Sequence, residues 1–180
     1  QGGMRHFVSA PYLDGRALER LYVELIDAAA DSIEIVSPYL NPTPRIEAAL
    51  SRAQARGVAV RFVARVRLDG DLGGRLMTEL NMLFVERYAD RYEILEYLPE
   101  SVVLHTKLLV VDGRLAVVTS ANLNRRSFYH DTENGVMVLD RAFAARIRAV
   151  IDAYRAESQP ATPTSYPVRP LARAILTMPE

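Results

Sequence analysis

The sequence predicts an α/β fold with a mixed, largely parallel central sheet and helices on both of its faces. Two observations support this fold class. Helical and extended patterns alternate along the first half of the chain, as they do in parallel β–α–β units. In the second half, two apolar runs are joined by Asp112-Gly113, a dipeptide that is a strong signal for an antiparallel hairpin.

The first half of the chain alternates between helix and strand from residue 18 onwards. Apolar residues at helical spacing predict helices over 18–31, 46–56 and 72–84. Short apolar runs predict strands over 33–36, 58–66 and 92–98. The first strand ends at a Ser-Pro pair, and the second helix ends at a glycine. This alternation places the first strands side by side in a parallel arrangement.

The second half of the chain is richer in strands. Strands are predicted over 102–111 and 115–118, on either side of the Asp-Gly dipeptide, and over 136–139. Apolar spacing predicts a last helix over 143–154. Beyond Ser158, four prolines precede Ala172, so we expect an extended segment that lies on the surface.

The length and composition indicate a single globular domain. We place it at residues 4–158, followed by a proline-rich surface tail at 159–180, while residues 1–3 look like a tag remnant. The 22 basic and 22 acidic side chains cancel, which argues against a typical nucleic-acid binder. The absence of cysteine excludes disulfides and thiolate metal sites. No apolar stretch reaches the roughly 20 residues that span a bilayer.

A histidine and a lysine interrupt the apolar run over 102–111. In an extended strand the side chains alternate between faces, so His105 and Lys107 are expected to point the same way. The flanking residues, including Val103, are apolar, which predicts a strand buried on both faces. Because an unpaired buried ammonium group is costly, Lys107 is expected to have a counter-charge or a functional role.

Three further polar residues follow at the ends of the next apolar runs. Ser120 and Asn122 lie two residues apart just after one run, and Glu133 precedes another. Taken singly, Ser120 and Asn122 are also typical turn residues, and Glu133 has the alternative of a solvated loop carboxylate. Together with His105 and Lys107, they predict a site that holds an anion next to a reactive imidazole.

The order His, one residue, Lys, four residues, Asp112 resembles the HKD motif of the phospholipase D superfamily. The resemblance continues through Thr119-Ser-Ala-Asn, where the family usually has Gly-Ser-Ala-Asn, and reaches Glu133. Upstream, Ser37-Pro38-Tyr39 and Arg56-Gly57-Val58-Ala59-Val60 look like parts of bacterial phospholipase D and cardiolipin synthase-like proteins. The similarity covers most of the chain from the first helix to the last. Thr119 is a departure, but it removes no catalytic group.

The resemblance implies a division of labour among the five polar residues. His105 would be the nucleophile that forms a covalent phosphohistidine, or else the general acid. Lys107 and Asn122 would donate hydrogen bonds to the phosphate oxygens, with help from Ser120. Glu133 would accept the second imidazole proton and fix the tautomer.

Other polar residues receive weaker expectations. Asp112 belongs to the motif, but aspartate is favoured at a tight turn for backbone reasons, so we expect a structural role. Tyr39 is a candidate for the substrate cleft, with ordinary packing as the alternative. Arg125 and Arg126 are candidates for binding a phosphate or head group, with a surface salt bridge as the alternative. The side chains over 130–133 are an incomplete set of metal ligands, and the implied chemistry needs no metal or cofactor.

The implied reaction needs two histidines on opposite sides of the phosphate, and this chain has one copy of the motif. His6 and His130 have no lysine two residues later, so neither marks a second copy. Family members form homodimers or fold two copies within one chain. We therefore expect a second HKD domain as partner, either a homodimer mate or the missing half of a longer chain. We favour the missing half, because residues 1–3 look engineered and the matching segments look like the second half of two-copy bacterial proteins.

The predicted function is phosphodiester hydrolysis or transfer on phospholipids, with cardiolipin synthase-like activity as its specific version. The alternatives are a metal-independent homodimeric nuclease of the same superfamily and a non-catalytic half that serves as a scaffold. We expect a bacterial protein that is cytoplasmic or membrane-associated. The segment Val168 to Leu176 carries two arginines among apolar residues, which fits either peripheral contact with a membrane or packing on its own domain.

Overall fold

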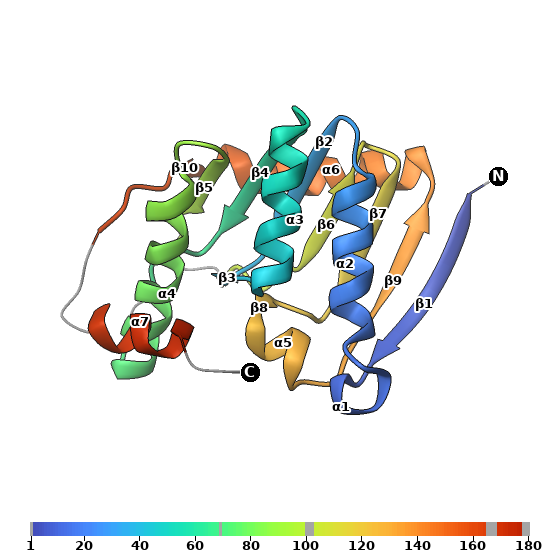
Figure 1. Ribbon diagram of the computed structural model, residues 1–180. Helices are drawn as coiled ribbons and strands as arrows, with labels where there is room; N and C mark the ends of the chain where they lie inside the picture. Colours follow the sequence, from blue (N-terminus) through green and yellow to red (C-terminus); the bar gives the residue numbers. More distant parts are fainter. Residues whose placement is uncertain (1, 69, 100–102, 165–168, 178–180) are drawn as a thin grey trace.

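A central β-sheet organises the computed structural model, which describes residues 2–68, 70–99, 103–164 and 169–177. Its strands are β1 (Gly3–Ser9), β2 (Ser32–Val36), β4 (Ala59–Ala64), β5 (Glu93–Tyr97), β6 (Leu108–Val111), β7 (Leu115–Thr119), β9 (Glu133–Leu139) and β10 (Ser158–Pro160). Among the described residues, these form one eight-stranded sheet in the order β1-β9-β7-β6-β2-β4-β5-β10 (Figure 1). Two short strands, β3 (Leu40–Asn41) and β8 (Leu123–Asn124), pair in parallel beside it.

The sheet is mixed, as the sequence predicts, but it is not largely parallel. Within the eight-stranded sheet, only the β2–β4 and β4–β5 pairings of the described strands are parallel. The other pairings are antiparallel. The second half of the chain accounts for this difference, because strands joined by a tight turn must run antiparallel whereas parallel strands need a long crossover.

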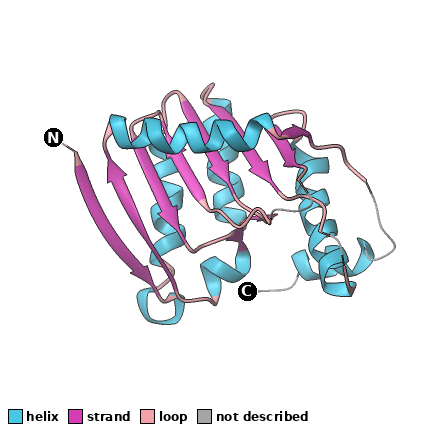
Figure 2. Ribbon diagram, turned by 180° about the vertical axis from the view of Figure 1, so that it is seen from behind, coloured by secondary structure: helices cyan, strands magenta, loops and turns pink. Residues whose placement is uncertain are grey.

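Helices cover both faces of the sheet, which confirms the prediction. One face carries α2 (Ala17–Ala28), α3 (Pro44–Ala55) and α4 (Leu72–Tyr88), and the other carries α6 (Arg141–Ala156), which lies across the strands in Figure 2. Phe62 and Phe128 are buried in the core beneath the first group, and Val110 and Ile151 in the core beneath α6. No helix in the described part of the chain is long and apolar enough to cross a membrane.

Asp112 and Gly113 form the turn of the β6–β7 hairpin, as predicted. Their φ angles are 52° and 58°, so both residues adopt the left-handed conformation. They are the two central residues of a β-turn closed by the N–H of Arg114, which donates to the carbonyl oxygen of Val111 at 3.0 Å, and three residues separate the paired strand ends. Asparagine, aspartate and glycine tolerate the left-handed conformation best, which explains why this dipeptide was a reliable signal.

The predicted strand over 102–111 is too long. Residue 102 lies outside the described residues, residues 103–107 have no regular structure, and β6 begins at Leu108. Val103 is 80% exposed, so the strand is not flanked by buried residues on both sides of His105. The β1 strand was not predicted, because it is a mostly exposed edge strand without a clear apolar alternation. Gly3, assigned to a tag remnant, begins this strand.

The C-terminal segment is not uniformly extended. Its first part, β10, pairs with β5, and its last described part is a helix, α7 (Arg169–Thr177). Ala172 of α7 is fully buried against Leu80 and Leu83 of α4. Pro170 is tolerated because it lies in the first turn of the helix, where a missing N–H costs little. Two shorter helices, α1 (Pro11–Asp14) and α5 (Arg125–Tyr129), complete the described structure.

Candidate active site

The five polar residues that define the predicted site gather at one edge of the sheet. His105 and Lys107 precede β6, Ser120 and Asn122 follow β7, and Glu133 begins β9. Because β6, β7 and β9 are adjacent and antiparallel, the start of β6, the end of β7 and the start of β9 meet. The same edge, the lower one in Figure 1, also carries β3, β8, α5 and α1.

Lys107 is a buried cation with few partners. Only 6% of the residue is exposed, and its ammonium group donates a hydrogen bond of 2.6 Å to the carbonyl oxygen of His105. Burial lowers the pKa of Lys107, and the negative charge of Glu133 raises it, with a net lowering. Lys107 is also the only lysine in the sequence. The site therefore contains a lysine whose charged form is disfavoured by its surroundings.

His105 lies at the surface of the same edge. The residue is exposed, and no hydrogen bond to its imidazole is found among the described residues. The backbone ladder continues past the start of β6, because the N–H of Thr119 donates to the carbonyl oxygen of Lys107 at 3.3 Å. The lysine is thus held close to the sheet, while the imidazole two residues earlier is open to solvent and to a ligand.

Ser120 and Glu133 are bonded to each other. The Ser120 hydroxyl donates to the Glu133 carboxylate and accepts the N–H of Asn134 at 3.0 Å. Glu133 is 6% exposed, and burial together with this nearby charge raises the pKa of Tyr22 on α2. The expected hydrogen bond between Glu133 and His105 is not found among the described residues. In this arrangement the carboxylate positions the serine hydroxyl.

Asn122 presents an unsatisfied amide group. Its backbone N–H donates to the Ser127 hydroxyl at 3.0 Å, and the backbone N–H of Ser127 donates to the Asn124 side chain at 2.9 Å. These two bonds hold the loop against the start of α5. The side-chain oxygen of Asn122 is buried and has no partner among the described residues. An unpaired buried acceptor costs about 1–3 kcal/mol. The amide nitrogen of the same side chain is the group that can donate to a phosphate oxygen.

Asp112, the last residue of the motif, lies at the opposite end of β6. Its carboxylate accepts backbone N–H groups from Ala30 at 3.0 Å, Asp31 at 2.7 Å and Ser32 at 2.9 Å. Burial alone would raise the pKa of Asp112, but these bonds outweigh it and lower the pKa. The contacts join the hairpin to the loop between α2 and β2, and they do not reach the edge with His105.

The two residues proposed for the cleft differ in their surroundings. Tyr39 is half-buried in the loop after β2, and its carbonyl oxygen accepts the Ser37 hydroxyl at 2.9 Å. Ser37 also accepts the N–H of Leu123 at 3.0 Å, which ties this loop to the site edge. Arg126 forms an ion pair with Asp131 at 3.1 Å, and its side chain is 78% exposed. The surface salt bridge is therefore the contact that Arg126 makes in this structure.

Two anchoring roles were not predicted from the sequence. Ser37 connects β2 to β8, and Ser127 fixes the backbone of Asn122. Ser127 directly follows Arg126 within the stretch that resembles the family, and Ser37 was interpreted as the end of a strand and as part of the upstream resemblance. Neither pattern indicated an anchoring role. No group of three histidine or acidic side chains that could hold a metal ion is found within the described ranges.

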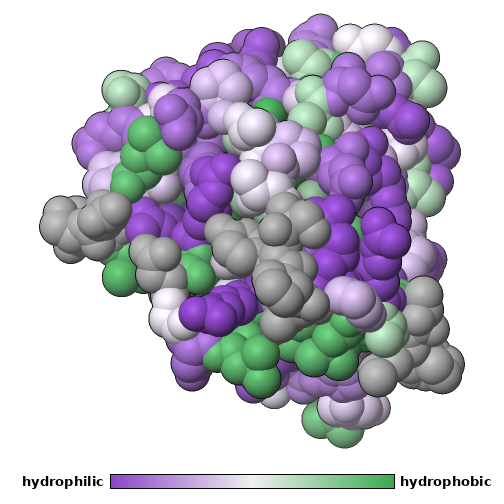
Figure 3. Space-filling view, turned by 90° about the vertical axis from the view of Figure 1, so that its left-hand side faces the viewer, coloured by the Kyte–Doolittle hydropathy of each residue, from purple (hydrophilic) through white to green (hydrophobic). Residues whose placement is uncertain are grey.

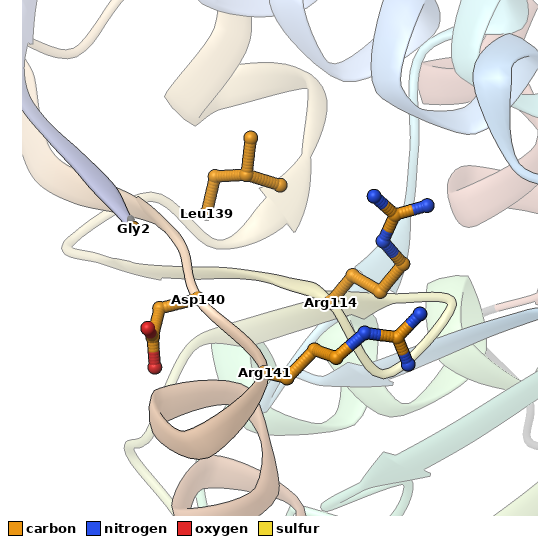
Figure 4. A pocket seen from close by; sticks show the side chains of 5 residues that line it. All are labelled: Gly2, Arg114, Leu139, Asp140 and Arg141. Carbon is orange, nitrogen blue, oxygen red and sulfur yellow. The ribbon is translucent and has the colours of Figure 1, made fainter.

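A separate pocket of about 370 Å³ lies at the other edge of the sheet, beside the β6–β7 hairpin. Its lining includes Arg114 from the turn and Arg141 from the start of α6 (Figure 4). Asp140, which precedes Arg141, also lines this pocket, but its carboxylate accepts the N–H of Phe143 as the cap of α6. This pocket is removed from His105 by the length of β6 and does not contribute to the candidate site.

Comparisons with known proteins agree with this geometry. Residues 22–155 match the family described as "Cardiolipin synthase, PLD-like domain". Cardiolipin synthase A of Pseudomonas aeruginosa is 36% identical over 143 residues, which are 79% of this chain and 28% of that protein. A minor cardiolipin synthase of Bacillus subtilis is 28% identical over 152 residues, 84% of this chain and 36% of that protein. The chain thus spans between about a quarter and about a third of these relatives.

Solved structures show the same fold. Phosphatidylserine synthase of Haemophilus influenzae superposes with a TM-score of 0.78 at 17% identity, over 97% of this chain and 44% of that one. The phospholipase D family member Nuc of Salmonella typhimurium gives a TM-score of 0.70 at 19% identity, over 89% of this chain and 99% of that one. The fold, the motif and the matched family model lead to one assignment: the chain belongs to the phospholipase D superfamily, in the family of cardiolipin synthase PLD-like domains.

Proposed function

We propose that this chain is one half of an enzyme that transfers or hydrolyses phosphodiesters of phospholipids through a phosphohistidine. The observation that carries the proposal is the grouping of His105, Lys107, Ser120, Asn122 and Glu133 at one edge of the sheet. The curated relatives reported above are cardiolipin synthases by name, which favours a lipid substrate over a nucleic acid. The neutral overall charge favours the same choice.

In the first step, an imidazole nitrogen of His105 attacks the phosphorus atom. A P–N bond forms, and the P–O bond to the leaving alcohol breaks. The leaving oxygen takes a proton from the histidine of the second half, which acts as general acid. His105 is suited to this role because it is exposed and its imidazole has no competing hydrogen bond among the described residues. The two histidines exchange roles if His105 is instead the general acid.

Lys107 and Asn122 stabilise the charge that develops on the non-bridging oxygens. The Lys107 ammonium donates one described hydrogen bond, to a backbone carbonyl, so its other N–H groups can donate to a phosphate. Asn122 is held in place through its backbone N–H, and its side-chain amide nitrogen is the group that donates to a phosphate oxygen. Ser120 is positioned by Glu133 and lies beside them. Preorganised donors of this kind are a large source of catalytic power.

In the second step, an acceptor alcohol or water loses its proton to the second histidine and attacks phosphorus. The P–N bond breaks, His105 is released, and the new phosphodiester or the phosphatidic acid leaves. The chain supplies one such histidine and spans only part of its relatives, so the reaction requires a second HKD domain. That domain is the other half of a longer chain or a second copy of this one.

The test is turnover of phosphatidylglycerol in excess EDTA by the protein at a measured oligomeric state, with mass spectrometry of the trapped adduct. We expect turnover that survives EDTA, a phosphatidyl adduct on His105, and loss of both in His105→Ala. The matched control is His6→Ala, which removes an exposed histidine of β1 and should change neither. Full activity of His105→Ala would show that the site is wrong. Cleavage of single-stranded DNA without turnover of lipid would show that the substrate is a nucleic acid and not a phospholipid.

A further inference from the structure

A second pocket lies on the site side of the molecule, between α4, α5 and α7. Its volume is about 420 Å³, within the range of about 300–1,000 Å³ that is typical of small-molecule sites. The apolar walls are Leu76, Met77 and Leu80 of α4 and Ile175 of α7. Met77 and Ile175 are half-buried, so their side chains line the opening without being part of a closed core. The pocket thus offers apolar surface to a ligand.

The polar side of this pocket is formed in part by residues that follow Asn122 closely in the sequence. Asn41 and Asn124, which face each other in the β3–β8 pair, line it. Asn124 follows Asn122 by two residues and caps α5 through its bond to the N–H of Ser127. The segment that carries the proposed phosphate ligands therefore ends in the wall of the pocket.

Arg125 and Arg126 of α5 give the same side a positive character. Arg126 is paired with Asp131, but the Nε atom of Arg125 is buried and has no hydrogen-bond partner among the described residues. An unpaired buried donor on a guanidinium is costly. A guanidinium also suits the phosphate and ester oxygens of a lipid. The pocket therefore combines an apolar wall with a cationic rim.

Exposed apolar side chains lie on the helices that form the pocket. Leu72 at the start of α4 is 63% exposed, and Leu171 of α7 is 46% exposed. Figure 3, which looks onto the face with α4 and α7, shows apolar surface gathered at its lower end. α7 itself is amphipathic, with Arg173 exposed and Ala172 buried. Since the buried side of α7 packs on α4, the exposed Leu72 and Leu171 are the apolar surface that these helices offer to a lipid.

We propose that the pocket between α4, α5 and α7 is an acyl-chain subsite that receives one chain of an anionic glycerophospholipid while its phosphate lies at His105. This proposal rests on the proposed function, because it assumes a lipid substrate. Charge complementarity at Arg125, and the place of Asn124 in the pocket wall two residues after Asn122, favour this occupant. A neutral apolar ligand would leave the rim of Arg125 and Arg126 without an anion, and a deacylated head group would leave the apolar wall exposed.

The first test measures how affinity depends on chain length. Hexanoyl, octanoyl and decanoyl lysophosphatidylglycerol are titrated into His105→Ala, which prevents turnover, and glycerophosphoglycerol serves as the deacylated reference. We expect the dissociation constant to fall by about fourfold for each added methylene that enters the pocket. Met77→Trp, which fills the pocket, and Ile175→Glu, which charges its wall, should each flatten this dependence. Met4→Trp, at a β1 position that is 75% exposed, should leave it unchanged.

The second test locates the chain directly. Phosphatidylglycerol with a diazirine in one acyl chain is bound from vesicles, irradiated, and mapped by peptide mass spectrometry. Adducts should concentrate on the peptides of α4 and α7 and fall about tenfold in Met77→Trp. Adducts spread over other surfaces, or a chain-length dependence that persists in both pocket variants, would overturn the subsite. So would a Met77→Trp protein that no longer assembles with a second HKD domain, because the pocket would then be a protein interface.

The two proposals fail in different ways. Turnover of lipid without any dependence on chain length would remove the subsite and leave the proposed function intact. Binding of acyl chains by the pocket, with no turnover by the assembled protein, would support the subsite and count against the catalytic proposal.

Discussion

The two ends of the β6–β7 hairpin carry the two charged residues of one short motif and treat their charges in opposite ways. At the turn, Asp112 accepts three backbone N–H groups, and its pKa is lowered, so the charged form is favoured. At the open end, Lys107 is buried with one described hydrogen bond, and its pKa is also lowered, so the charged form is disfavoured. The same direction of shift has opposite meaning for an acid and a base.

The Asp112 charge stabilises the folded state, whereas the Lys107 charge destabilises it. The Asp112 carboxylate satisfies backbone groups of the loop before β2 that would otherwise lack partners. The Lys107 ammonium satisfies one carbonyl and costs the desolvation of a cation. A disfavoured charge is typical of functional sites, and the same sheet edge holds a buried side-chain oxygen without a described partner, that of Asn122. We infer that Lys107 is retained for its ligand and Asp112 for the fold.

The largest effect is expected at the open end. Lys107→Met should reduce kcat by about 100- to 1,000-fold, the loss that follows removal of one preorganised donor to a developing oxyanion. The same substitution should raise the free energy of unfolding, because it removes a buried cation and leaves an apolar chain of similar length. Turnover and urea denaturation of the same preparation test both parts. A variant that loses both activity and stability would erase the contrast between the two ends.

The turn should respond in the opposite sense. Asp112→Asn keeps a residue that tolerates positive φ but removes the charge, and we expect it to lower the free energy of unfolding by about 2 kcal/mol with kcat unchanged. Because the pKa of Asp112 is lowered on folding, its contribution is present above the unfolded value near pH 3.9 and is lost as pH falls through the folded value. The variant should lack this acid-dependent slope.

The control for the turn is Asp90→Asn, since the Asp90 side chain is 74% exposed and its ion pair with Arg91 is 3.8 Å long. An exposed pair of this kind contributes between about 0 and 1 kcal/mol. Equal destabilisation by the two substitutions would mean that the backbone bonds of Asp112 are not what matters.

The turn and the open end also differ in how well they were predicted from sequence. Asp112-Gly113 specifies its own turn, because few residues tolerate two left-handed positions in a row. The grouping of Lys107 with Ser120 and Glu133 followed from spacing and resemblance, and the structure brings these residues to one edge. Two features depended on tertiary structure: Glu133 contacts Ser120 instead of His105, and β6 starts only at Leu108.

The edges of the sheet were the hardest part to predict. A buried strand is recognised by its apolar residues. β1 and β10 lie at the two sheet edges and are largely exposed, so they lack that pattern and are identified only by their pairing with a neighbouring strand. α7 was not predicted because prolines favour an extended chain. A helix is nevertheless possible when a proline lies in its first turn, as it does here. These elements form because they pair with or pack on other parts of the fold, and a single sequence does not show such long-range contacts.

A smaller effect concerns the titration of the lysine itself. Because Lys107 is the only lysine, selective ¹⁵N-lysine labelling gives one side-chain resonance whose pKa is read by NMR. Burial places that pKa below the ordinary value near 10.4, with Glu133 opposing the shift. The unfolded chain then binds more protons between the two values, so the stability of the wild type relative to Lys107→Met should rise with pH in that window. A lysine that titrates at or above the ordinary value would show that its charge is already paired.

The smallest effect is expected at Thr106, which lies between the two catalytic candidates and faces the other side of the sheet. Its hydroxyl shares a hydrogen bond of 2.7 Å with the Tyr154 hydroxyl of α6, so the segment with His105 and Lys107 is anchored to the helix behind it. Tyr154→Phe removes this bond and should lower the free energy of unfolding by about 1 kcal/mol. If the anchor positions the site, kcat should fall a few-fold with KM unchanged, and Thr106→Val should reproduce the effect. If the double substitution lowers the free energy of unfolding no more than either single one, the two hydroxyls act through the one hydrogen bond that they share. Additive losses would mean that each hydroxyl acts alone, and the open end would then be held by the lysine and its backbone ladder without help from α6.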